Sequence, residues 1–174
     1  MTRLSATLSM TVLYASLMLA SWPAGAEALR IVDSVSLEDV RSAMREAGLD
    51  DLQDRTRDPN YPSLSSQYQD DTTVQATLFA CAPTPAGCMG AELASPIAVK
   101  SKDQASQIAN SLDRELFGFD VTVLSALNES GKEIHIVSIS SYLIFDHGVS
   151  DRLLPRTLER LLQAVDRVSR LRKK

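Results

Sequence analysis

Residues 73–93 read TVQATLFACAPTPAGCMGAEL and predict two strands joined by a tight connection. In the first half, apolar residues occupy every second position, which is the period of a half-buried strand: Val74, Ala76, Leu78 and Ala80. The same spacing returns at Met89, Ala91 and Leu93 and predicts the partner strand. Two prolines and one glycine between the strands are typical of a short connection. The stretch therefore predicts an antiparallel hairpin.

Cys81 and Cys88 stand at the two ends of this connection and are the two cysteines of the chain. We expect them to form one disulfide across the hairpin, which the chain-entropy model values at about 2.5 kcal/mol. A redox or metal-binding role is the alternative interpretation. Thiol oxidoreductases use a two-residue spacing at a helix start, and zinc needs four clustered ligands, whereas the chain has two cysteines and two histidines. The sequence therefore favours a structural disulfide and predicts no metal and no cofactor.

Three amphipathic helices are predicted around the hairpin from apolar residues spaced three and four apart. The first runs from a capping Ser36 to Gly48, with Leu49 folded back behind its end, and carries Leu37, Val40, Met44 and Ala47. The second follows a capping box at 101–104 and carries Ala105, Ile108, Ala109, Leu112 and Leu116. The third begins at Ser150 or Asp151, has Pro155 in its first turn, and carries Leu154, Leu158, Leu161, Val165 and Val168.

Further strands are predicted on both sides of the second helix. The polar stretch 50–71 fits two weak, exposed strands around the turn at 58–60. Residues 121–127 and 133–143 form another pair, joined by a turn at 128–131. Apolar residues lie on both faces of 133–143, so we expect a central strand covered on both sides. The order is helix, three or four strands, helix, two strands, helix, and it predicts an α+β fold in which helices pack an antiparallel sheet.

The N-terminus predicts export. Arg3 precedes the uncharged, apolar stretch 4–20, and Ala24-Gly25-Ala26 has the small residues of a signal-peptidase site. We expect a signal peptide over 1–26 and a single mature domain over 27–174, secreted and located in the periplasm. An uncleaved anchor is the alternative, because about 17 apolar residues are at the lower limit for spanning a bilayer.

The order of these short features resembles the YbjN domain family, bacterial proteins often labelled sensory transduction regulators, whose fold is similar to that of type III secretion chaperones. The resemblance runs from about Val32 to Val168. It rests on the helix before Gly48, the Asp58-Pro59 turn, the strands at Cys81 and Cys88, the Ile108 and Asn110 pair, and residues 145–150 before the last helix. It implies a fold and a chaperone-like or adaptor role, and it implies no catalytic residue.

Catalytic motifs do not stand out in the chain. It has no Gly-x-Ser-x-Gly, no phosphate-binding glycine loop and no His-Glu-x-x-His, so no catalytic residue is predicted. His135 is interpreted as a packing residue of a strand and His147 as a turn residue, whose neighbour Asp146 we expect to point to the opposite face. Asn128-Glu129-Ser130 matches a glycosylation sequon and is interpreted as a turn.

The charge pattern limits the partners. The 174 residues include 18 basic and 22 acidic ones, for a net charge of -4, which argues against nucleic-acid binding. Five basic residues nevertheless cluster at the C-terminus: Arg167, Arg170, Arg172, Lys173 and Lys174. The helix dipole explains such a cluster, and contact with anionic lipid or an acidic partner is the alternative. We expect the partner to be another polypeptide or a second copy of the chain, with no membrane contact apart from this basic tail. A small enzyme without a recognisable motif and a structural subunit of an envelope complex remain alternatives.

Overall fold

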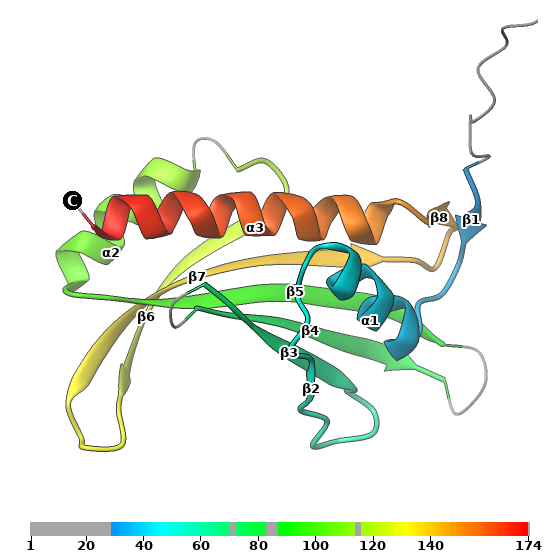
Figure 1. Cartoon of the computed structure of the whole chain (residues 1–174), viewed down its shortest axis with the longest axis horizontal. Coiled ribbons are helices and arrows are strands. Elements are labelled where there is room, and N and C mark those ends of the chain that lie inside the picture. The colour runs from blue at the N-terminus through cyan, green and yellow to red at the C-terminus, as the bar shows by residue number, and fades with distance from the viewer. Residues whose placement is uncertain (1–28, 70–71, 83–86, 114–115, 174) are drawn as a thin grey trace, which may run out of the picture.

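A six-stranded antiparallel sheet with three helices on one face forms the body of the molecule (Figure 1). The computed structural model describes residues 29–69, 72–82, 87–113 and 116–173. The predicted signal peptide, 1–26, lies outside these residues, as does most of the connection between the two cysteines. The α+β fold class predicted from the sequence is confirmed. In the part of the chain that the structure describes, no helix is both long and apolar enough to cross a membrane.

The sheet has the strand order β2-β3-β4-β5-β7-β6. Its strands are β2 (Gln53–Asp54), β3 (Ser63–Tyr68), β4 (Thr72–Cys81), β5 (Cys88–Val99), β6 (Asp120–Leu127) and β7 (Glu133–Ile144). β4 and β5 form the predicted hairpin, in which Leu78 pairs with Ala91 and Cys81 pairs with Cys88. β5 then pairs with β7, so that Leu93 lies opposite Ser141.

All three helices cover the same face of the sheet (Figure 1). They are α1 (Leu37–Glu46), α2 (Lys102–Asp113) and α3 (Leu153–Arg172). α3 packs on β5 and β7 between the other two helices. The apolar stripe predicted on this helix is buried along its whole length: Leu154, Leu158, Leu161, Val165 and Val168. Burial of this stripe against the sheet builds the core.

The ends of the helices follow local hydrogen bonding. Ser36 and Asp39 form a capping box at the start of α1, and Gly48, with a φ of 81°, ends the helix in the left-handed region. Leu49 folds back and its N–H donates to Met44 O at 2.9 Å, as predicted. For α3 the predicted cap is wrong: the residue before the helix is Arg152, which makes no side-chain cap. The Ser150 hydroxyl instead accepts from the backbone N–H of Arg152 at 3.2 Å.

Three further features differ from the sequence predictions. Two short strands, β1 (Ile31–Val32) and β8 (Val149–Ser150), pair with each other beside the start of α3, and no pattern predicted so short a pair. β3 is not exposed: residues 63–66 are all buried, because α1 and the chain before β3 cover both faces. β7 is not covered on both sides: it is second from the edge, and Tyr142 and Ile144 are exposed.

Candidate protein-binding surface

The face of the sheet opposite the helices is broad and largely polar. It consists of the odd-numbered residues of β4 and the even-numbered residues of β5, β6 and β7, and we call it the open face. Register places these side chains in rows across the strands, for example Thr77, Glu92 and Tyr142. The residues that alternate with them point to the helices and form the core, such as Leu78, Leu93 and Ile139. Strand alternation thus assigns one face to folding and leaves the other to solvent.

An apolar patch stands at one end of the open face, and we call it the aromatic patch: Phe79, Tyr142 and Ile144. The rings of Phe79 and Tyr142 meet edge to face, with centroids 6.4 Å apart and an interplanar angle of 61°. Tyr142 is 56% exposed and Ile144 is 50% exposed. Three strands contribute to the site, because Phe79 of β4 pairs with Gly90 of β5, and Gly90 pairs with Ile144 of β7.

The polar end of Tyr142 interacts with Glu92 on the neighbouring strand. A hydrogen bond to the Glu92 carboxylate, followed by the negative charge of that carboxylate, raises the pKa of the Tyr142 phenol above its usual value. Asp120 of β6 adds a smaller effect in the same direction. The aromatic patch therefore carries an apolar body and an acidic rim, a combination that suits recognition of another protein surface.

Small side chains occupy the middle of the open face. Ala94, Ser140 and Asp120 form one row, and Pro96, Ser138 and Thr122 form the next. Apolar residues return at the far end, where Ala98, Ile136 and Leu124 lie side by side. A strip of small side chains between two apolar ends can accept an extended contact rather than enclose a small molecule.

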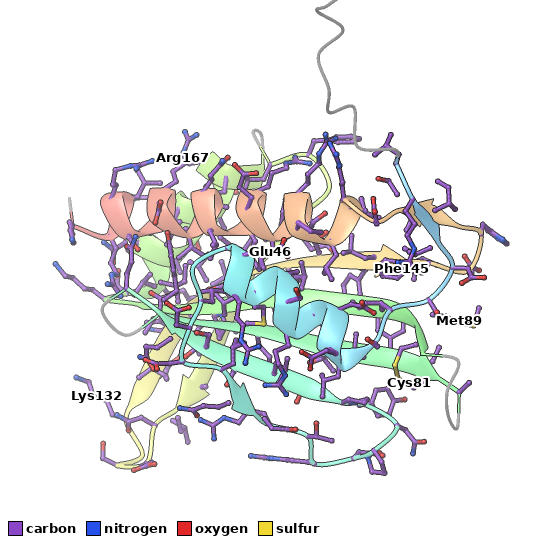
Figure 2. The ribbon with its side chains drawn as sticks, turned by 45° about the vertical axis from the view of Figure 1, so that its right-hand side comes forward. Glu46, Cys81, Met89, Lys132, Phe145 and Arg167 are labelled. Atoms are coloured by element: carbon purple, nitrogen blue, oxygen red, sulfur yellow. A yellow bond between two sulfur atoms is a disulfide. The ribbon has the colours of Figure 1, made fainter. Side chains whose placement is uncertain are left out.

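The Cys81–Cys88 disulfide predicted from the sequence is present and joins β4 to β5 next to the aromatic patch. Phe79 and Gly90 face each other two residues from the cysteines along the hairpin. Figure 2 shows Cys81 at the same end of the molecule as Met89. The bond ties together the two strands that position Phe79, so it supports the geometry of the patch.

The outer edge of β6 is a second feature that could accept another chain. β6 is an edge strand of eight residues and carries one charged residue, Asp120, at its start. The opposite edge strand, β2, is two residues long. Long edge strands with few charges are templates for pairing with another strand, and short ones are not.

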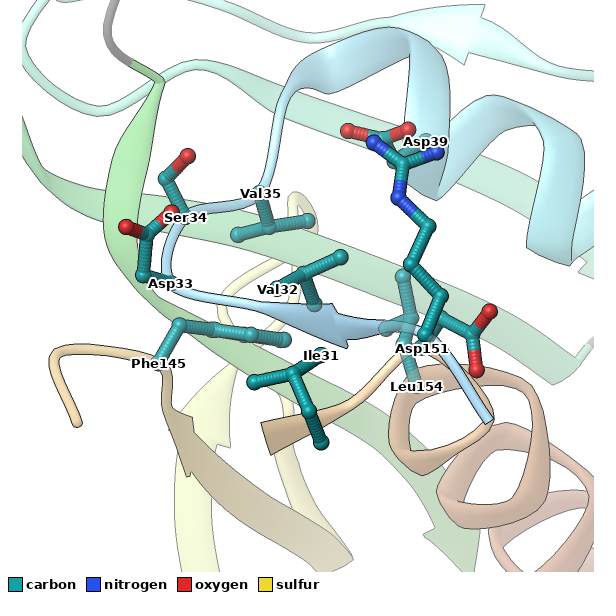
Figure 3. Close-up of a pocket in the computed structure, with 10 residues that line it drawn as sticks. Ile31, Val32, Asp33, Ser34, Val35, Asp39, Phe145, Asp151 and Leu154 are labelled. Carbon is teal, nitrogen blue, oxygen red and sulfur yellow. The ribbon is translucent and has the colours of Figure 1, made fainter. Parts of the chain in front are cut away.

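Cavities lie on the helical side of the sheet. One of about 280 Å³ is lined by β1, the start of α1 and the start of α3 (Figure 3). Its polar groups include Asp33, Asp39 and Asp151, with Arg30 beside them. The Asp39 carboxylate is already engaged, since Oδ2 accepts from the N–H of Ser36 at 2.8 Å. These lining residues include no histidine, cysteine or lysine, and the hydroxyl among them is that of Ser34.

A groove of about 360 Å³ separates α1 from α3. At its floor the Tyr68 hydroxyl donates to Asp166 Oδ1 at 3.0 Å, and Gln69 Nε2 donates to the same oxygen at 2.6 Å. Burial and the hydrogen bond to Asp166 raise the pKa of Tyr68. These contacts tie the end of β3 to α3, so we interpret the groove as part of the packing between elements and not as a binding site.

The two histidines do not form a catalytic relay. His135 Nδ1 lies 3.1 Å from Ser125 Oγ and 4.0 Å from Glu133 Oε1. A relay needs its nucleophile and its acid on opposite ring nitrogens, and here both approach the same one. His147 Nε2 lies 3.6 Å from Asp146 Oδ2, so the expectation that this pair points apart is wrong. Residues 145–148 form a turn rather than a strand, which lets the neighbours meet, but His147 is 92% exposed.

Comparisons with known proteins add little. No family model matches the chain, and no curated protein matches it. Among solved structures, the crystal structure of YbjN from E. coli is similar, with a TM-score of 0.49 and 10% sequence identity over 80% of this chain and 91% of that chain. Similarity at this level assigns neither a family nor a role. The described residues also contain no group of three or more His, Cys, Asp or Glu side chains that could hold a metal.

Proposed function

We propose that this chain is an exported, non-enzymatic domain of the bacterial envelope that binds another polypeptide through its open face. The exposed aromatic patch, which is bordered by polar residues, carries this proposal, because exposed apolar clusters rimmed by polar residues are typical of protein interaction sites. A disulfide next to the patch is compatible with an oxidising compartment. The proposed role is that of a chaperone-like or adaptor module.

The partner we expect is a protein with an apolar surface and basic groups near it. Phe79, Tyr142 and Ile144 would enter the apolar part of that surface, and Glu92 beside them would meet a basic side chain. Aromatic residues are common energetic centres of such interfaces. The small residues in the middle of the open face let the partner approach the sheet closely.

Site-specific crosslinking in cells tests this function. A photoreactive amino acid placed at Thr77, next to the patch, should capture a partner, and one placed at Ser42 on exposed α1 should not. Ile144→Asp should abolish the capture, because it puts a charge into the apolar contact. Glu46→Gln on α1 serves as the matched control and should leave capture intact. Capture that is equal at both positions, or unaffected by Ile144→Asp, would contradict the proposal.

The number of captured chains separates related roles. One chain at fixed stoichiometry would identify a structural subunit of an envelope complex, and many different chains would identify a chaperone-like module. If the photoreactive residue at position 77 captures no protein, the alternative of a small enzyme has to be considered again.

The β6 edge favours a second candidate, the pairing of two copies of this chain. Antiparallel pairing centred on Val123 would place Thr122 opposite Leu124 and keep the two Asp120 side chains apart. Thr122→Lys should then convert a dimer to a monomer, measured by light scattering during size-exclusion chromatography. Thr73→Lys, on β4 of the open face, should leave the dimer unchanged. A wild-type chain that is monomeric at high concentration would exclude this candidate.

A further inference from the structure

The outer face of α3 carries a row of arginines along its whole length. They are Arg152, which directly precedes the helix, and Arg156, Arg160, Arg167 and Arg170 within it, and we call them the arginine stripe. At 100° per residue all five lie on one side of the helix, opposite the buried stripe around Leu161. Figure 2 shows Arg167 on the side of α3 that faces away from the sheet. Two of the five, Arg167 and Arg170, also belong to the basic C-terminus seen in the sequence.

The helix dipole does not account for this row. A dipole favours cations at the C-terminal end, and it disfavours them at the N-terminal end. Arg170 lies in the last turn, whereas Arg152 and Arg156 lie at the start of the helix, where the dipole opposes them. On this face of the helix the five arginines outnumber one acidic residue, Glu159, since Asp166 is turned toward Tyr68. Asp39, Glu46 and Asp151 line the groove beside Arg152 at the start of the row. An acidic chain thus gathers positive charge on one outer surface.

An exposed aromatic ring stands beside the stripe. Phe117, in the connection between α2 and β6, is 91% exposed. Arg160 fixes this connection to α3: its guanidinium donates to Phe117 O at 2.6 Å and lies 5.4 Å from the centre of the Phe119 ring. Figure 1 shows the connection running alongside α3 on the helical side of the sheet. The ring and the arginines therefore belong to one surface.

We propose that the arginine stripe, with Phe117, binds the surface of a bilayer that contains anionic phospholipids. All five cations are arginine, whose planar group binds phosphate oxygens in pairs. They span residues 152–170 of a straight helix, roughly 27 Å, which matches a plane of headgroups. The stripe holds no large apolar side chain that could form the core of a protein interface, and Phe117 is suited to enter the interfacial region.

Membrane binding through α3 would fix the orientation of the protein. α3 and the open face lie on opposite sides of the sheet (Figure 1). A protein held to a membrane by α3 would therefore present the aromatic patch away from that membrane. Lipid binding does not depend on the proposed polypeptide binding, because no residue is shared between the two surfaces.

Vesicle sedimentation tests the proposal with the protein in the form that the cells accumulate. The protein should sediment with vesicles of phosphatidylcholine and phosphatidylglycerol, and much less with vesicles of phosphatidylcholine alone. The neutral vesicles also measure any binding by the apolar N-terminal stretch. Raising the salt concentration should weaken the binding, because the contact is electrostatic.

Matched charge variants identify the surface. Arg156→Gln, Arg167→Gln and Arg170→Gln together should weaken binding to anionic vesicles roughly a hundredfold, since each basic residue near such a surface contributes about a fivefold factor. Removing three cations elsewhere, by Arg45→Gln, Arg57→Gln and Lys132→Gln, should cost tenfold or less. Phe117→Ser should weaken the binding severalfold. Circular dichroism verifies that each variant is folded.

Four outcomes would overturn the proposal. Equal binding of the wild-type protein to neutral and anionic vesicles, or no binding to either, contradicts the proposal. Equal losses in the two triple variants would show that net charge acts rather than the stripe. Binding of polyglutamate, but not of anionic vesicles, with the same dependence on the three arginines would assign the stripe to an acidic polypeptide instead.

Discussion

The ring of Phe79 lies directly over Gly90 of the neighbouring strand. A Cβ added to Gly90 would stand 2.2 Å from Cε2 of that ring, far inside van der Waals contact. The backbone of Gly90 thus serves as the floor of the aromatic patch, and Tyr142 closes the ring from the side. Glycine is required here by close approach and not by its backbone angles.

Gly90→Ala should therefore displace Phe79. The new methyl group forces the ring outward, and we expect a loss of about 1–2 kcal/mol in the free energy of unfolding, the usual cost of overpacking. The same substitution should reduce partner capture from Thr77. Urea denaturation measures the stability. In a Phe79→Ala background the clash is gone, so Gly90→Ala should cost little there; an equal cost in both backgrounds would contradict the role of the ring.

The elements that bury apolar stripes were predictable from the sequence. α1, α2, α3 and the β4–β5 hairpin were all expected, because helical or strand periodicity and capping residues mark them locally. The pairing of β1 with β8 was not, since two residues carry no period. The polar serines of β3 predict an exposed strand, yet Ser63, Ser65 and Ser66 are buried by tertiary packing.

The candidate surface was harder to predict for a physical reason. Apolar residues on both faces of β7 suggested two covered faces, but Tyr142 and Ile144 stand at the end of the strand on the open face. Phe79 is the residue whose sequence position indicates the patch. It is aromatic, and strand alternation places it on the same face as the polar residues Thr73, Gln75 and Thr77. Whether a face is covered depends on where the helices pack, which a single sequence does not reveal.

The tyrosine of the patch should titrate at unusually high pH. Glu92 raises the pKa of Tyr142, so Glu92→Gln should lower that pKa toward the ordinary value of about 10. Asp120→Asn should lower it less, because its effect is smaller. NMR of ring-labelled tyrosine measures both shifts. Since the folded pKa is the higher one, the stabilisation is complete below pH 10 and is lost as the pH rises through the folded pKa.

The disulfide should stabilise the folded domain by an amount set by the short loop that it closes. Replacing Cys81 and Cys88 by serine should lower the free energy of unfolding by about 2.5 kcal/mol without changing the fold. Alkylation of the protein from the producing cells followed by intact-mass analysis, with and without reductant, reports the bond. Two alkylated thiols in the unreduced protein would contradict this prediction.

The mature N-terminus should lie near Glu27. The apolar stretch 4–20 followed by Ala24-Gly25-Ala26 is the basis of this prediction. N-terminal mass analysis of the protein from the producing cells measures it directly. A membrane-bound product that keeps Met1 would establish an uncleaved anchor instead.

The last helix, α3, should be essential for folding. Leu161 is fully buried at the centre of α3, where the helix packs on β5 and β7. Leu161→Asp places an unpaired charge in this core and should cost several kcal/mol, so the domain should unfold or fail to accumulate. Circular dichroism and size-exclusion chromatography measure the outcome. The control is Gln163→Asp, two residues away on the exposed side, which should remain folded. If Leu161 served only as a dimer seam, Leu161→Asp would instead give a folded monomer, and burial against the sheet of the same chain is the reason that we expect unfolding.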